Sequence, residues 1–177
     1  MILLNLKKHN IFFTNDSKAF YKSIFENYSL PDDPSIHVTK ADSLINKSYL
    51  KDFSTLKITV QVPYMQLDNI SSTKEYNNLK EKVFDKLENM GLNNLNDRIV
   101  FQKTFSPSDI ASKYLANRGA IYGVVGDKDK NQGTSMSKVS DKYKNLYFVG
   151  GSVNPGSSIP MVVTGARLVC DKLNSNQ

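Results

Sequence analysis

Residues 145–169 have the sequence NLYFVGGSVNPGSSIPMVVTGARLV, and they decide the architecture that this chain is expected to have. Leu146 to Val149 form a short apolar and aromatic run that ends at Gly150. Such a run is typical of a buried strand in a parallel sheet. Ligands of open α/β sheets sit beyond the carboxyl ends of these strands, so the glycines that follow are candidates for a binding turn.

A helix is predicted after the glycine turn, from about Pro160 to Leu173. Pro160 suits the first turn of a helix, and either Ser157 or Ser158 can cap it. The free N–H groups at its start favour an anion or a carbonyl oxygen. An ordinary strand–loop–helix connection would show the same pattern. The predicted packing positions of this helix are Met161, Val162, Gly165, Leu168, Val169 and Leu173.

The rest of the chain predicts strands and helices in a mixed sheet, a fold of the α/β class in the α+β sense. Strands are predicted at 9–14, 35–39, 55–63 and 99–105, and helices at 17–27, from 72 to Gly91, and from 106 to about 117. The strand at 55–63 alternates apolar and polar residues and is expected to be half-buried and antiparallel. Residues 41–54 predict a surface loop, and 128–144 a long loop or hairpin.

The clearest local signal is the helix that begins at Ser72. Ser72-Thr-Lys-Glu75 is a capping box, and Gly91 is a stop signal. The predicted apolar face of this helix contains Tyr76, Leu79, Val83, Phe84, Leu87 and Met90.

Composition narrows the class of protein. The chain has 177 residues, of which 40% are hydrophobic and 23% charged, as in a soluble protein of one or two domains. Its net charge is +6, but the lysines are scattered, which indicates solvated faces or contact with an anionic membrane surface. No nucleic-acid motif accompanies the charge. The single Cys170 precludes an internal disulfide and fits the cytoplasm, and no spacing of cysteine and histidine predicts a metal site.

Several segments together carry a resemblance to a known family. They are His9-Asn-Ile-Phe-Phe-Thr, Leu30-Pro-Asp-Asp-Pro-Ser-Ile, Thr104-Phe-Ser-Pro-Ser-Asp-Ile, Asn117-Arg-Gly-Ala-Ile-Tyr-Gly-Val-Val and the glycine-rich stretch described above. In this order they resemble the phytoene-desaturase family of FAD-dependent carotenoid desaturases and oxidases, and most strongly its bacterial C30 members. The resemblance implies an FAD-dependent amine-oxidase or phytoene-desaturase-like fold from His9 to about Leu173.

The resemblance also implies a division of the chain. Residues 9–144 would belong to the substrate domain, and 145–177 would supply the last strand and helix of the FAD-binding domain, whereas 1–8 do not match. The G-x-G-x-x-G fingerprint of a Rossmann domain is missing from this sequence. The chain is therefore expected to be the carboxyl-terminal part of a longer enzyme, from a split or truncated gene, that needs an amino-terminal flavin-binding part.

By resemblance, Gly150, Gly151 and Ser152 would lie along the ribityl chain and pyrophosphate of FAD. The helix start would lie beneath the isoalloxazine, where amides of the helix can bond the pyrimidine oxygen. Its residues are Ile159, Pro160, Met161 and Val162, and the expected amide donors are those of Met161 and Val162.

Arg118 and Tyr122 are the candidate substrate-binding residues. Arg118 would meet a carboxylate, a phosphate or a carbonyl, although a structural salt bridge explains it equally well. Tyr122 would line an apolar tunnel or pack in the core. The same two interpretations apply to Phe12, Phe13 and Tyr64.

The favoured function is oxidation of the terminal methyl group or aldehyde of a C30 carotenoid, in the cytoplasm and peripheral to the inner face of the membrane. A C30 carotenoid desaturase and a non-enzymatic gene remnant are the alternatives. The sequence shows no acid–base pair or activated nucleophile, so no catalytic residue is assigned. Ser157-Ser158 stands where members of the family usually carry glycines, which puts activity in question.

Overall fold

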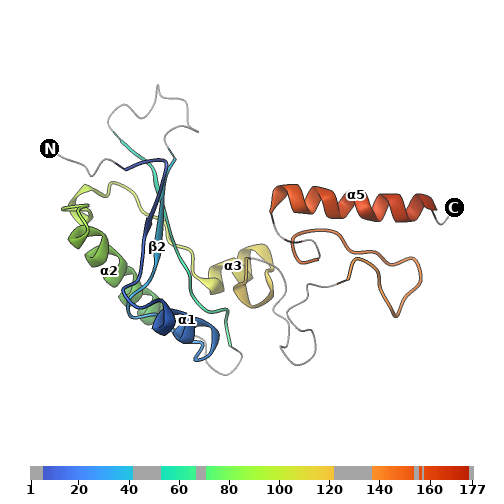
Figure 1. The fold of residues 1–177 in the computed structure, drawn as a ribbon, viewed down its shortest axis with the longest axis horizontal. Helices are drawn as coiled ribbons and strands as arrows, with labels where there is room; N and C mark the ends of the chain where they lie inside the picture. The colour runs from blue at the N-terminus through green and yellow to red at the C-terminus, as the bar shows by residue number, and fades with distance from the viewer. Residues whose placement is uncertain are drawn as a thin grey trace. The chain divides into compact units, whose positions relative to one another are not determined.

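A computed structural model describes residues 6–41, 53–66, 71–121, 137–153, 156 and 158–175. The chain divides into two compact units, whose elements are drawn in Figure 1. The first contains the described residues up to 63 together with 71–103, and the second contains 64–66 and the described residues from 104 onward. The predicted loop at 41–54 falls almost wholly outside the described residues.

The first unit is built on a three-stranded sheet. Its strands are β1 (His9–Phe12), β2 (Ile36–Lys40) and β3 (Leu56–Val60), in the order β1-β2-β3. Both pairs are antiparallel, with Ile36 opposite Phe12 on one side and Val60 on the other. The strands predicted at 9–14, 35–39 and 55–63 are confirmed, as is the antiparallel pairing predicted for the strand at 55–63. The described residues form no mixed sheet, so that part of the predicted fold class is wrong.

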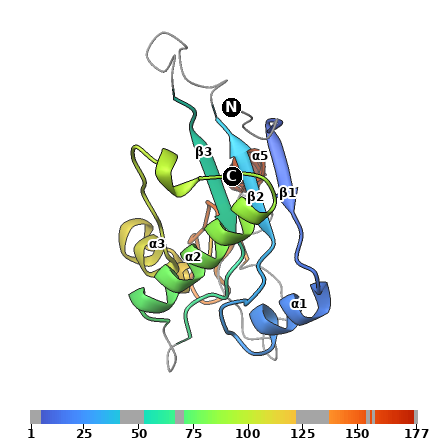
Figure 2. The same ribbon diagram turned by 90° about the vertical axis from the view of Figure 1, so that its left-hand side faces the viewer.

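Helix α2 (Thr73–Asn89) lies across one face of this sheet (Figure 2). The predicted capping box is present at its start. The Glu75 amide donates to Ser72 Oγ at 3.3 Å, and the Ser72 amide donates to Glu75 Oε2 at 2.6 Å. Each bond satisfies a backbone donor that the first turn of a helix leaves without an intrahelical partner.

The end of α2 is set by Gly91, as the sequence predicts. Gly91 has a φ of 108°, which favours glycine. Its amide donates to Glu88 O at 3.0 Å, and the Leu92 amide donates to Leu87 O at 2.9 Å. These two bonds form a Schellman motif, and they turn Leu92 back beside Leu87 in the core.

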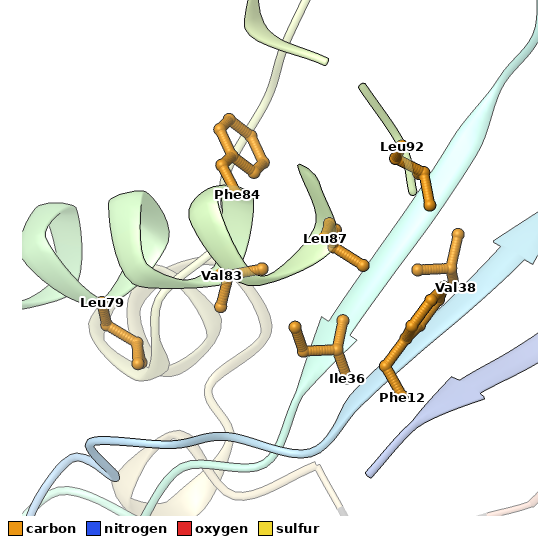
Figure 3. Packing of buried hydrophobic residues seen from close by; sticks show 8 residues of the cluster. All are labelled: Phe12, Ile36, Val38, Leu79, Val83, Phe84, Leu87 and Leu92. Atoms are coloured by element: carbon orange, nitrogen blue, oxygen red, sulfur yellow. The ribbon is translucent and has the colours of Figure 1, made fainter. Parts of the chain in front are cut away.

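The core of the first unit lies between α2 and the sheet. Leu79, Val83 and Leu87 point from α2 toward Ile36 and its neighbours (Figure 3). The full cluster of buried residues is Phe12, Ile36, Val38, Leu79, Val83, Phe84, Leu87 and Leu92. Spacings of three and four residues put the helical members on one face, and alternation puts Ile36 and Val38 on the same face of β2.

Helix α1 (Ser17–Phe25) follows β1 and buries Phe20 and Ile24. Asp16 caps it, because the Ala19 amide donates to Asp16 Oδ1 at 2.9 Å. The helix ends before the predicted Asn27, and Phe25 is 49% exposed.

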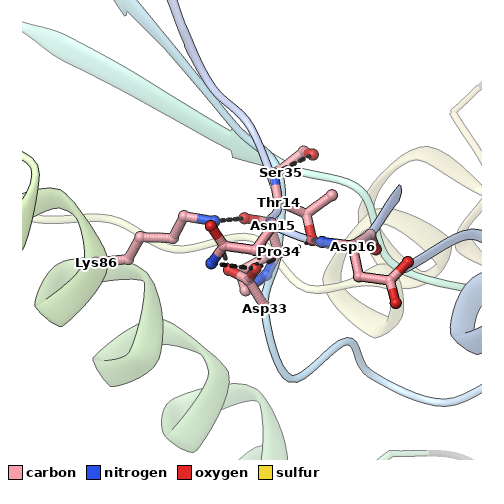
Figure 4. Close-up of polar contacts among 7 residues, drawn as sticks. All are labelled: Thr14, Asn15, Asp16, Asp33, Pro34, Ser35 and Lys86. Atoms are coloured by element: carbon pink, nitrogen blue, oxygen red, sulfur yellow. Dashed lines mark hydrogen bonds and ion pairs between the residues drawn. The ribbon is translucent and has the colours of Figure 1, made fainter. Parts of the chain in front are cut away.

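Asp33 joins three segments of the first unit (Figure 4). Its Oδ2 accepts from the Asn15 amide at 2.7 Å and from Thr14 Oγ1 at 3.1 Å, and its Oδ1 accepts from Lys86 Nζ on α2. Lys86 Nζ also donates to Pro34 O at 2.9 Å. The Asn15 amide and the Lys86 ammonium hold the pKa of Asp33 below its usual value. The carboxylate thus connects the segment before α1, the segment before β2 and the last turn of α2.

The described elements of the second unit are mainly helical. Helix α3 (Pro107–Tyr114) has a capping box, in which Ser106 Oγ accepts from the Asp109 amide at 3.3 Å. It ends earlier than predicted, near Tyr114. The remaining helical segments are the 3₁₀ turn η2 (Asn117–Gly119) and helix α5 (Ile159–Ser175), while a further 3₁₀ turn, η1 (Asn96–Arg98), belongs to the first unit.

Two predicted strands are wrong. Residues 99–105 form no strand, and Phe101 is 82% exposed. The segment 146–149 contributes only one isolated antiparallel bridge, Val139 to Tyr147, and Val149 is 58% exposed. An apolar run becomes a buried strand only where neighbouring strands satisfy its backbone groups, and no such strands flank these runs among the described residues.

The bridge belongs to a small hairpin. The Phe148 amide donates to Lys138 O at 2.8 Å, and the Ser140 amide donates to Leu146 O at 3.0 Å. This region lies in and just beyond the predicted loop or hairpin at 128–144, of which residues 128–136 are outside the described part. None of the described helices is both long enough and apolar enough to cross a bilayer.

Replacing Leu87 by Ala is expected to lower the free energy of unfolding by about 2–5 kcal/mol, because Leu87 is fully buried and the surrounding core relaxes only in part. Urea unfolding followed by circular dichroism measures this loss. Val100→Ala is the control: Val100 is 76% exposed, and a change of less than about 0.5 kcal/mol is expected. Equal losses in the two variants would contradict the assignment of the core.

Asp33→Asn is expected to cost about 1 kcal/mol at pH 7, a value reduced for solvent screening since the side chain is 37% exposed. The pKa of Asp33 in the folded state lies below its ordinary value of 3.8, so the ionised group stabilises the fold above that pH. This contribution is lost as the pH falls through the lowered pKa, and the variant and wild type should converge there.

Asp32→Asn is the matched control for Asp33. Asp32 also pairs with a lysine, Lys82, at 2.6 Å, but its side chain is 96% exposed. Its replacement is expected to change the free energy of unfolding by less than about 0.5 kcal/mol at every pH. A pH-independent difference between Asp33→Asn and wild type would disprove the role given to the ionised carboxylate.

Candidate functional site

The predicted binding turn begins at Gly150. Gly150 has a φ of 124°, and the Val153 amide donates to its carbonyl oxygen at 3.3 Å. A Cβ atom built at Gly150 meets nothing within 4 Å, so the backbone conformation rather than crowding requires glycine. Ser152 is exposed and Gly151 is half-exposed, whereas Val153 is buried. The turn therefore presents its first three residues outward and anchors itself through Val153.

The predicted helix is present as α5 and begins one residue earlier, at Ile159, with Pro160 in its first turn. Ser158 immediately precedes it, and Ser157 lies outside the described residues. The Val162 amide donates to Ser158 O at 2.9 Å and is thus engaged within the helix. The Met161 amide belongs to the first turn, where the helix supplies no acceptor. Of the two expected donors, Met161 is the better placed to bind a ligand.

The first turn of α5 is exposed to solvent. Ile159 is 83% exposed and Met161 is 45% exposed. Of the predicted packing positions, Gly165 and Val169 are buried. Met161, Leu168 and Leu173 are exposed, Leu168 by 47% and Leu173 by 42%, so those three assignments are wrong. The helix has an apolar stripe that the described residues cover only in part.

Arg118 is held in a strained turn. It has a φ of 51°, in the left-handed region that few residues other than glycine adopt. Its guanidinium carbon lies 5.7 Å from the centre of the Tyr64 ring, within the range of a cation–π interaction. The Met65 amide donates to Arg118 O at 3.0 Å. The side-chain contact described for Arg118 is thus with an aromatic ring.

Gly119 packs closely against the start of α3. It has a φ of 69°, and a Cβ built on it would lie 2.2 Å from Pro107 O. Pro107 is in turn positioned by the capping box between Ser106 and Asp109, and the Ser106 hydroxyl and amide lower the pKa of Asp109. The conformation of Arg118 therefore follows from the packing of its neighbour.

Gln66 adds an unsatisfied donor to the segment that contains Tyr64 and Met65. Its Nε2 atom is buried and finds no acceptor in the described part of the chain. Buried polar groups without partners are rare and call for an explanation, such as a ligand acceptor. The pattern of the sequence did not single out Gln66, because burial of a glutamine amide is a tertiary property.

The candidate residues fall into two groups. Arg118, Tyr64 and Gln66 come from two segments that the Met65–Arg118 backbone bond joins. No hydrogen bond or ring contact described for this unit connects them to the glycine turn or to the start of α5. Tyr122 lies outside the described residues. Of the aromatic residues considered for a tunnel wall, Phe12 belongs to the core of the first unit and Phe13 is 69% exposed.

Comparison with known proteins finds relatives that share one name. The chain is similar to 4,4'-diaponeurosporene oxygenases. It is 41% identical over 97% of its length to those of Staphylococcus aureus strains bovine RF122 / ET3-1, MSSA476 and USA300. It spans 34% of the length of these oxygenases. No family model matches the chain.

The similarity to these oxygenases bears out the resemblance to C30 carotenoid enzymes that the sequence motifs indicate. The match covers nearly the whole chain and therefore includes Arg118, Gly119 and the glycine turn with the start of α5.

Gly119→Ala is expected to loosen the start of α3, because the added Cβ meets the Pro107 carbonyl in a region where the backbone cannot yield. Hydrogen–deuterium exchange of the α3 amides should rise severalfold. In Gly150→Ala the backbone is also strained but the Cβ enters open space, so α3 exchange should stay as in wild type. Unchanged α3 exchange in Gly119→Ala would contradict the described packing.

Proposed function

We propose that this chain is the carboxyl-terminal part of an FAD-dependent oxidoreductase that oxidises the terminal methyl group or aldehyde of a C30 carotenoid. The observation that carries the proposal is the 41% identity to 4,4'-diaponeurosporene oxygenases over 97% of the chain. The names of these relatives favour oxidation of an end group over desaturation. Activity then requires the part of the relatives that this chain does not match, in which we place the dinucleotide-binding fingerprint.

The residues of the glycine turn and α5 fit one side of a flavin site. Gly150, Gly151 and Ser152 present backbone and a hydroxyl outward, and the start of α5 offers the Met161 amide at the positive end of a helix. We propose that these residues, with Ile159, Pro160 and Val162, hold the flavin. When bound, FAD would supply the two-electron redox chemistry, and molecular oxygen would supply the oxygen atom that the end group gains. The residues of this chain orient the cofactor and exclude water.

Arg118 and Gln66 are the proposed polar contacts for the oxidised end of the substrate. Both carry N–H donors, and an aldehyde or carboxylate oxygen is an acceptor. Tyr64 holds the guanidinium of Arg118 over its ring, which limits the directions in which the guanidinium can donate. Tyr122 remains a proposed wall of the apolar tunnel. The proposed domain boundary between residues 144 and 145 separates these substrate residues from the flavin residues.

The exposed apolar surface of the second unit supports the proposal that another part of the protein covers it. Ten of the twelve buried hydrophobic side chains described belong to the first unit, and only Val153 and Val169 belong to the second. Exposed apolar residues of the second unit include Phe148, Val149, Ile159, Val163 and Leu168. Apolar surface of this extent is expected to be covered by another part of the protein. We place the assembled enzyme in the cytoplasm, peripheral to an anionic membrane surface that suits the net charge of +6.

A chimera tests this function. Residues 1–177 replace the matched segment of a Staphylococcus aureus 4,4'-diaponeurosporene oxygenase, which is produced in cells that accumulate 4,4'-diaponeurosporene. An end-group aldehyde or acid in the pigment extract, with yellow flavin in the purified chimera, is the expected outcome. A pigment with more conjugated double bonds would indicate a desaturase instead. A colourless chimera without product would show that the segment is a remnant.

In this chimera Arg118→Ala is expected to lower kcat/KM by at least about tenfold, since a charge-assisted hydrogen bond contributes about 1.5–3 kcal/mol. Flavin content should stay unchanged. Arg167→Ala is the control, because Arg167 is 83% exposed on α5 and pairs only loosely with Asp171, at 3.9 Å. Equal activity of the two variants would remove Arg118 from the substrate site.

A further inference from the structure

Both histidines of the chain lie on the face of the sheet opposite α2. His9 on β1 stands directly opposite Thr39 on β2, and His37 precedes Thr39 by two residues on the same strand. Directly opposed and alternate residues project from one face, so the three side chains are direct and diagonal neighbours. Both imidazoles are exposed, and Thr39 is half-buried. The flavin and substrate proposals make no use of them.

The donor atoms of these three residues form a nearly equilateral triangle. His9 Nδ1 and His37 Nε2 are 3.4 Å apart, and Thr39 Oγ1 lies 3.5 Å from the first and 3.4 Å from the second. These separations are long for hydrogen bonds. They match the spacing of neighbouring ligand atoms around a tetrahedral Zn²⁺ ion, which is about 3.4 Å for metal–ligand bonds of about 2.0–2.1 Å.

We propose that His9 Nδ1 and His37 Nε2 bind a divalent transition-metal ion of the zinc class, with the Thr39 hydroxyl beside it. Imidazole nitrogen is a preferred ligand of Zn²⁺, Ni²⁺ and Cu²⁺. Nowhere in the described ranges do three His, Cys, Asp or Glu side chains gather around one point, so the site has two strong ligands. Water completes the shell, and the ion is exchangeable rather than structural.

A positive charge on the same face of the sheet disfavours a bound cation. Lys57 on β3 stands directly opposite Thr39 and therefore projects beside the triangle. Its ammonium repels a dication and is expected to weaken the site.

Zinc titration of the full chain by isothermal calorimetry at pH 7.5 tests the site. All proteins carry Cys170→Ser, because Cys170 is an exposed thiol and the chain's one cysteine. One zinc site is expected, and His37→Gln should weaken it by at least about tenfold, since changes behind a ligand alone cost about 10- to 100-fold. Since His37 is exposed, the circular dichroism spectrum and Tm without zinc should be unchanged.

Lys57→Glu tests the site through an expected gain in zinc affinity rather than a loss. The new carboxylate beside the triangle should strengthen zinc binding severalfold, whereas Lys22→Glu on α1 makes the same charge change away from the site and should not. The proposal fails if the parent binds no zinc, if His37→Gln binds it as tightly as the parent, or if both charge variants behave alike. None of these readouts involves flavin or carotenoid, so they are separate from the test of the enzyme.

Discussion

The burial of one face of α2 against β2 is the contact on which the first unit depends. Leu79, Val83 and Leu87 meet Ile36 and Val38 there, and Leu87, Ile36 and Val38 are fully buried. Both ends of α2 are fixed by local bonds, the capping box at Ser72 and the Schellman motif at Gly91, so the helix presents a defined length of apolar surface to the sheet. The Asp33 carboxylate then fixes the position of α2 relative to α1 and the start of β2 through Lys86.

The second unit is organised differently. It has one helix with a capping box, α3, and a short hairpin, but among its described residues few apolar side chains are buried. Its most constrained feature is the turn at Arg118 and Gly119, where contact with Pro107 enforces a backbone conformation that is rare for arginine. Strain of this kind persists only where the surrounding packing holds it, and it often accompanies a binding site. Together with the buried amide of Gln66 and the exposed start of α5, it indicates a unit that can make contacts beyond those among the described residues.

The two faces of the sheet in the first unit have separate roles. One face builds the core with α2, and the other carries His9, His37 and Thr39 in a triangle that the core does not need. Substitutions on that outer face can therefore change metal binding without changing the fold. Since antiparallel sheets commonly keep one face in water, the division follows from the architecture itself.

Local signals in the sequence determined much of this protein: the helix from Ser72 to Gly91, the helix that includes Pro160 and the alternating strand at 55–63. Each depends on neighbouring residues alone, through capping bonds, prolyl geometry or alternation. The glycine turn was likewise predictable, because its conformation is a backbone property of Gly150. The apolar runs at 99–105 and 146–149 were not, since a strand needs partners that no local pattern supplies. Only the tertiary structure set Arg118 over Tyr64 and joined His9 to His37, because such contacts arise when distant segments pack and their side chains must share space.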